Sequence, residues 1–216
     1  NIYEYNHSHY DNDGNYRSEA DAPLQTQALE KIENGAWEVT LNGNFQSKYY
    51  TFDVTNDGET NEVVDPYAYS SGVNGERGMI VDFDSTNPIN WVENYRPNTI
   101  TNMTDYTVYE LHVRDLTTHN TWEGNDNYRG KFLGLSEKNT TYTEGDVTVT
   151  TGLDHISELG VNAVQLLPIF DFGVVDETRL DDPTYDAFNW GYLPLHFNTL
   201  EGSYSTNPYD GNTRIT

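Results

Sequence analysis

The sequence of 216 residues contains no cysteine, few basic residues and no long apolar run. The absence of cysteine excludes disulfide bonds and thiolate metal sites. Lysine and arginine number 11 against 35 aspartate and glutamate residues, which gives a formal net charge of −24. Such a field repels nucleic-acid phosphates, so we expect no nucleic-acid partner. We interpret the acidity mainly as an adaptation to solubility or environment.

No stretch approaches the roughly 20 apolar residues of a transmembrane helix, so we expect no membrane insertion. The chain is instead rich in aromatic side chains, with 17 Tyr and 4 Trp. Tyrosine on this scale suits β-structure and flat polar ligands better than a helical bundle. The acidity is compatible with neutral and with cationic ligands.

Short alternating segments in the first half of the chain predict strands. Large apolar residues alternate with polar ones, and turn signals such as Asn56-Asp57-Gly58 follow the strand candidates. The candidates are Ala36–Asn42, Lys48–Val54 and Arg77–Phe83. Several such strands separated by turns indicate an antiparallel β-sandwich. The segment Ser85–Met103, rich in proline and asparagine, is predicted to be a linker.

The second half of the chain has a different period. Tyr106–Leu116 predicts a strand that is buried on two faces, and Thr117–Thr150 is expected to be a polar loop. Apolar residues at helical spacing predict a helix over Gly152–Gly160, followed by a second buried strand over Val161–Phe170. A strand, a helix and a strand form a βαβ unit, which favours a parallel sheet or barrel.

An aromatic and nearly uncharged segment, Phe188–Pro208, follows the second of these strands. It lies beyond the carboxyl end of that strand, where α/β folds place their ligand sites. The acidic run nearby is interpreted as a solvated loop face, because charge runs usually are. Its members are Asp171, Asp176, Glu177, Asp181 and Asp182.

Three stretches together resemble type I pullulanases, starch-debranching members of the α-amylase superfamily. They are VYELHVRDL (Val108–Leu116), GLDHISELGVNAVQLLPIFDF (Gly152–Phe172) and FNWGYLPLHFNTLEGSYSTNPYDG (Phe188–Gly211). Upstream, residues 33–54 and 61–83 resemble the starch-binding-like β-sandwich of that family. The resemblance implies a multidomain β plus α/β fragment. Residues 1–100 would be a partial immunoglobulin-like sandwich of the carbohydrate-binding-module type, and residues 101–216 the first strands of a (β/α)8 TIM barrel.

The function implied by the resemblance is hydrolysis of α-1,6 linkages in pullulan, starch or glycogen with retention of configuration. The family's catalytic Asp and Glu come from later barrel strands, so we assign no catalytic residue and expect the isolated chain to be inactive. The implied partners are an α-glucan and the remainder of the barrel. The chemistry needs no cofactor, and a structural calcium ion stays open. A secreted or cell-surface location is favoured over a cytoplasmic one.

Within the third stretch, the resemblance assigns substrate contact to Tyr192, whose ring would stack on a sugar. The alternative is that Tyr192 is a core aromatic of a tight loop. Asn189 and Trp190 are expected to shape the same loop, and Trp190 can equally pack it onto the barrel rim. The family usually has Asp where this chain has Leu193. We interpret His112 as a buried, hydrogen-bonded residue and Arg114 as salt-bridged.

A second function class stays open, which is a non-catalytic carbohydrate-binding fragment with the sandwich as its working part. A binding module has no need of two barrel strands and an aromatic loop. The βαβ segment therefore favours the enzyme.

Overall fold

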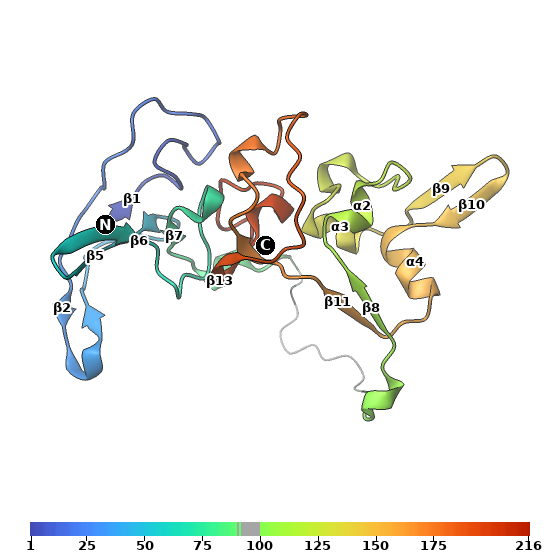
Figure 1. Ribbon diagram of the computed structural model, residues 1–216, viewed down its shortest axis with the longest axis horizontal. Coiled ribbons are helices and arrows are strands. Elements are labelled where there is room, and N and C mark those ends of the chain that lie inside the picture. The colour runs from blue at the N-terminus through green and yellow to red at the C-terminus, as the bar shows by residue number, and fades with distance from the viewer. Residues whose placement is uncertain (90, 92–99) are drawn as a thin grey trace.

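The structure is a computed structural model that describes residues 1–89, 91 and 100–216 and is rich in short strands (Figure 1). The N-terminal strands lie at one end of the molecule and the unit of β8, α4 and β11 at the other, with the C-terminal segment between them (Figure 1). Residues 90 and 92–99 of the predicted linker lie outside the described residues. Among the described helices, none combines the length and the hydrophobicity that a membrane span requires.

The N-terminal part is built from antiparallel strands, as predicted. Three strands form a sheet in the order β1-β4-β7, and two hairpins flank it. The sheet consists of β1 (Ile2–Tyr3), β4 (Tyr49–Tyr50) and β7 (Gly78–Met79), and the hairpins of β2 (Glu30–Lys31) with β3 (Trp37–Glu38) and β5 (Phe52–Asn56) with β6 (Glu59–Val63). Tyr3, Tyr49 and Met79 form the buried core of the sheet.

The turn between β5 and β6 has the positive φ angles that its sequence predicts, 51° at Asp57 and 85° at Gly58. The candidate strand Ala36–Asn42 is correct only in part, because its strand is limited to Trp37–Glu38. It pairs backward with β2 across residues 33–35 rather than forward across residues 42–43.

The predicted βαβ unit is present. Strand β8 (Val108–Leu111) pairs in parallel with β11 (Ala163–Leu166), and α4 (Gly152–Glu158) lies on the connection between them. The predicted burial on two faces is wrong, because Val108 and Val164 are 52% and 44% exposed. Within the described part of the chain β8 and β11 pair only with each other, so no neighbouring strand covers their outer edges.

The prediction of a plain polar loop over Thr117–Thr150 is also wrong. This segment begins at the end of α2 (Asp115–Thr118) and contains α3 (Phe132–Ser136) and a hairpin of β9 (Thr141–Glu144) with β10 (Val147–Thr150). The hairpin strands consist largely of threonine, valine and tyrosine, which favour strands even where they are exposed.

The C-terminal segment is organised by β12 (Phe170–Phe172) and β13 (Pro194–Leu200), an antiparallel pair with irregular register. A second core forms here from Val113, Phe172, Val175 and Tyr204, so the end of β8 packs against this segment. The remaining elements are α1 (Phe83–Thr86) and 3-10 turns at Glu33–Gly35, Val73–Gly75, Met103–Asp105, Asp126–Tyr128, Glu177–Arg179 and Gly202–Tyr204.

Candidate functional site

The aromatic loop, residues 188–193, precedes β13 and presents three rings to solvent. Phe188, Trp190 and Tyr192 are exposed, the last two at 63% and 53%, while Asn189 is half-buried and Gly191 is buried. The rings of Phe188 and Trp190 meet edge to face, with centroids 6.3 Å apart. The alternation directs every second side chain outward. Tyr192 is therefore not a buried core aromatic, and its ring is free to meet a ligand.

Asn189 holds the loop in shape. Its Oδ1 atom accepts a hydrogen bond from the backbone N–H of Gly191 at 3.1 Å, and its Nδ2 atom donates to the carbonyl oxygen of Ala187 at 3.1 Å. Nε2 of His112 lies 3.1 Å from the same Oδ1 atom. Both ends of the amide are thus engaged within the protein.

Two residues of the loop have left-handed backbone conformations. Gly191 has a φ of 79° and lies against the carbonyl oxygen of Pro168. Leu193 has a φ of 67°, in a region where a leucine side chain is strained. Asp and Asn adopt this region more readily than other residues with a side chain. Leu193, which stands where the resembling family usually has Asp, is therefore a strained position of the loop.

His112 is buried at the end of β8, as predicted, and contacts two parts of the C-terminal segment. Besides Asn189, its Nε2 atom lies 3.0 Å from the hydroxyl of Tyr204, whose ring meets the imidazole edge to face. Burial raises the pKa of the Tyr204 hydroxyl, so this group stays protonated. Arg114 is exposed and makes no ion pair with the described residues, so its predicted salt bridge stays a prediction.

A buried charge cluster is formed by Asp171 of β12, Glu201 directly after β13, Glu177 and Arg214. Arg214 donates from Nη1 to Asp171 Oδ1 at 2.9 Å and from Nη2 to Glu177 Oε2 at 2.7 Å. The prediction of a solvated acidic face is wrong for Asp171 and Glu177, which are only 1% and 2% exposed. The reason is that Arg214, remote in sequence, compensates their charge.

The cluster has more acidic than basic groups. Burial, together with the neighbouring Glu177, raises the pKa of Glu201 to about 8, and burial also raises the pKa of Glu177. The three carboxylates offer oxygen atoms within 4.8 Å of one another and could hold an ion. The guanidinium of Arg214 already bonds two of these carboxylates, Asp171 and Glu177. The cluster is therefore an ion-pair network before it is a metal site.

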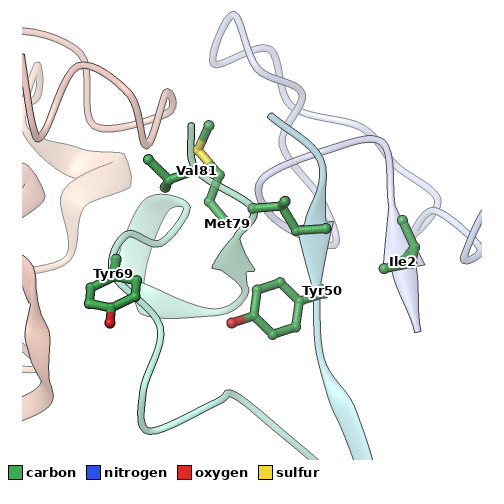
Figure 2. Close-up of a pocket in the computed structure, with 6 residues that line it drawn as sticks. Ile2, Tyr50, Tyr69, Met79 and Val81 are labelled. Carbon is green, nitrogen blue, oxygen red and sulfur yellow. The ribbon is translucent and has the colours of Figure 1, made fainter. Parts of the chain in front are cut away.

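A separate apolar cavity of about 300 Å³ lies beside the N-terminal sheet (Figure 2). It is lined by Ile2, Tyr50, Tyr69, Met79, Ile80 and Val81. The hydroxyl of Tyr50 already donates to Asp65 Oδ2 at 2.7 Å. The cavity has no acid, base or cation among its lining residues, so the aromatic loop is the better candidate for function.

Several residues of this region escape local sequence reasoning. Tyr204, Glu201 and Arg214 follow the aromatic segment in the sequence but carry no pattern that reveals their partners. The hydrogen-bond partners of Arg214 alone lie between 6 and 142 residues away in the sequence. The predicted trio of Asn189, Trp190 and Tyr192 does lie together in one loop.

Comparison with known proteins gives a consistent result. No protein-family model matches the chain. It is 38% identical to a pullulanase of Bacillus subtilis (strain 168) over 192 residues, covering 89% of this chain and 25% of the relative. A pullulanase of Klebsiella pneumoniae is 27% identical, with 84% and 22% covered.

Solved structures agree with these relatives. The crystal structure of apo pullulanase from Paenibacillus barengoltzii matches with a TM-score of 0.84 and 41% identity, covering 99% of this chain and 30% of that one. The pullulanase from Bacillus acidopullulyticus matches with a TM-score of 0.78 and 36% identity, covering 100% and 24%. This chain is therefore a homologue of the pullulanases and corresponds to about a quarter of the length of the curated relative from Bacillus subtilis.

Proposed function

We propose that this chain is part of a glycoside hydrolase that cleaves α-1,6-glucosidic branches in pullulan, starch or glycogen. The observation that carries the proposal is the match to the pullulanase of Paenibacillus barengoltzii over 99% of this chain. A plant relative, the chloroplastic isoamylase 3 of Oryza sativa subsp. japonica, is 33% identical over 54% of the chain. Relatives from distant sources thus point to starch debranching.

The proposed ligand of the aromatic loop is an α-glucan. The pullulanase of Paenibacillus barengoltzii has been solved in complex with maltohexaose and alpha-cyclodextrin. A glucose ring has an apolar face that a flat aromatic can cover without charge. The exposed rings of Trp190 and Tyr192 supply such surfaces, and the loop that carries them has no charged residue.

The finer architecture belongs to the same proposal. Residues 1–100 would form part of a β-sandwich of the carbohydrate-binding-module type, and residues 101–216 the start of a (β/α)8 barrel. The parallel pair of β8 and β11 supports the barrel. Among the described residues, the three carboxylates of the buried charge cluster are the side chains that could hold a structural calcium ion, and Arg214 competes with an ion for two of them.

A retaining mechanism needs two carboxyl groups about 5–5.5 Å apart across the scissile bond. Asp171, Glu177 and Glu201 are buried in an ion-pair network, so none of them is free to act on a sugar. We therefore propose that residues 1–216 alone do not release reducing ends from pullulan. The alternative, a non-catalytic carbohydrate-binding fragment, predicts the same inactivity. The two functions differ in what they predict for the full-length protein. Only the enzyme hydrolyses pullulan and needs the aromatic loop to do so.

The test is steady-state kinetics on pullulan with variants of Tyr192 in the full-length protein. Loss of a well-placed stacking contact in Tyr192→Ala should lower kcat/KM by about 100-fold. Tyr192→Phe should be much milder if the ring face makes the contact. Tyr67→Ala, at another exposed tyrosine, is the matched control and should keep full activity. Unchanged kinetics in Tyr192→Ala, or a loss explained by unfolding in a thermal melt, would refute the role of Tyr192.

A further inference from the structure

We propose that His112 is a positioning residue for the aromatic loop. Its Nε2–H group holds the side chain of Asn189, and Asn189 in turn holds the backbone that carries the rings of Trp190 and Tyr192. His112 is buried, so it acts on the ligand only through the loop. The inference rests on the proposed function of the loop, and it deepens that function by assigning the residue that sets the loop's geometry.

The first step concerns the orientation of the Asn189 amide, which backbone groups fix without reference to His112. The N–H of Gly191 can only donate, so the atom that it meets at 3.1 Å must be the amide oxygen. The carbonyl of Ala187 can only accept, so the atom that it meets must be the amide nitrogen. The oxygen of Asn189 therefore faces His112.

The second step assigns the proton on His112. An amide oxygen is an acceptor only, so Nε2 must carry the hydrogen at the 3.1 Å contact. The hydroxyl oxygen of Tyr204, 3.0 Å away, can accept from the same N–H group. On the other side of the ring, Nδ1 makes no hydrogen bond to the described residues, and the carboxylate of Asp115 lies 3.6 Å away. Nε2 remains the donor whether or not Nδ1 is protonated.

The third step concerns rigidity. His112 follows β8 directly, is buried and packs edge to face on Tyr204, a member of the second core. The loop, by contrast, exposes its rings and contains the strained Leu193. A bond from a rigid strand end to the one half-buried polar side chain of residues 188–193 therefore decides where the loop lies.

The experiment uses four variants of the full-length protein. His112→Phe keeps a ring and removes the donor, whereas His112→Gln keeps a donor near the position of Nε2. Asn189→Ala breaks the same bond from the other side, at a less buried position, in case His112→Phe fails to fold. Tyr204→Phe removes only the hydroxyl and leaves the bond between His112 and Asn189 intact, so it serves as the matched control.

Two readouts are measured, the dissociation constant for maltotetraose and the deuterium exchange of the peptide that contains Gly191. His112→Phe and Asn189→Ala should each weaken binding about tenfold, the effect of losing one well-placed hydrogen bond, and should speed exchange of Gly191. His112→Gln and Tyr204→Phe should stay within about threefold of the parent in binding. Adding His112→Phe to Asn189→Ala should change little further, because Asn189→Ala already removes the bond to His112 together with those to Ala187 and Gly191.

The outcomes separate the two proposals. If the parent protein does not bind maltotetraose, the glucan function fails, yet the exchange of Gly191 still decides whether His112 holds the loop. If His112→Phe folds and leaves both the exchange and the affinity unchanged, the inference is overturned. It is also overturned if Tyr204→Phe is as disruptive as His112→Phe, since the hydrogen bond between His112 and Tyr204, rather than the bond to Asn189, would then account for the effect.

Discussion

Gly191 packs so closely against the carbonyl oxygen of Pro168 that no Cβ atom fits between them. Its left-handed φ of 79° disfavours side chains in addition. We predict that Gly191→Ala displaces the aromatic loop and lowers the free energy of unfolding by about 2–4 kcal/mol, because it combines a backbone clash with an unfavourable conformation. Urea denaturation measures the loss.

The matched control is Gly160→Ala. Gly160 has a similar φ of 73°, but nothing lies within 4 Å of the position that its Cβ atom would take. Only the conformational cost of about 1 kcal/mol should remain there. Equal losses at the two positions would show that the contact with Pro168 is unimportant.

Leu193 predicts the opposite kind of result. Its side chain is mostly exposed, so its removal costs little burial, while its φ of 67° suits Asn or Asp better. Leu193→Asn should raise the free energy of unfolding by up to about 1 kcal/mol. The comparison is Leu195→Asn, at an exposed position of β13 with no positive φ, which should give no gain. A loss of stability in Leu193→Asn would show that the leucine side chain makes a favourable contact that outweighs the strain.

Arg214 should be among the most sensitive positions in the chain. Its guanidinium bonds Asp171 and Glu177 in a site that solvent does not reach, so Arg214→Met leaves buried carboxylates without a partner. The expected loss is about 3–5 kcal/mol. Arg179→Met, which removes a half-exposed pair with Asp182, should cost less than about 1 kcal/mol. Similar losses for both variants would show that the buried charge cluster contributes no more to the free energy of unfolding than an exposed ion pair does.

The same cluster predicts a pH dependence. The folded-state pKa of Glu201 is about 8 against an ordinary value of 4.5, so the folded state binds this proton more tightly than the unfolded state does. The contribution of Glu201 to stability is then complete below pH 4.5 and is lost as the pH rises through about 8.

Glu76 affects the stability in a different pH range. Burial raises its pKa, but hydrogen bonds from His7 and Ser8 outweigh burial and lower it to about 2.

The measurement is the free energy of unfolding between pH 4.5 and 8.5. It should fall over this interval in the parent and be flatter in Glu201→Gln, whose side chain cannot ionise. A rise with pH in the parent would show that the backbone donors of Phe172 and Ser203, which bond the Glu201 carboxylate, outweigh its burial.

The sequence predicts those parts of the fold that depend on neighbours along the chain. The helix over Gly152–Glu158 and the turn at Asp57-Gly58 follow from local spacing and local residue types. The exposure of Val108 and Val164 does not, because their apolar character gives no information on what covers them. Local composition likewise identifies the aromatic loop but not the bond from His112 that fixes it.

The burial of part of the acidic run could likewise not be predicted from neighbouring residues in the sequence. Asp171 and Glu177 resemble any other exposed acidic residues until Arg214 is placed beside them. A partner 37 or 43 residues away leaves no periodic signal, since the intervening chain can take many paths. Burial of charge is therefore visible only in three dimensions.

Arg214 also donates to the carbonyl oxygen of Gly72, 142 residues earlier, and Ser70 bonds the carbonyl of Gly211, 141 residues later. Closing segments of this length costs chain entropy before any contact offsets it, which slows folding. During synthesis the N-terminal sheet leaves the ribosome long before these partners exist. We expect these contacts of Gly211 and Arg214 to form late in folding. Until then the N-terminal strands have exposed edges, and their final packing depends on Gly211 and Arg214.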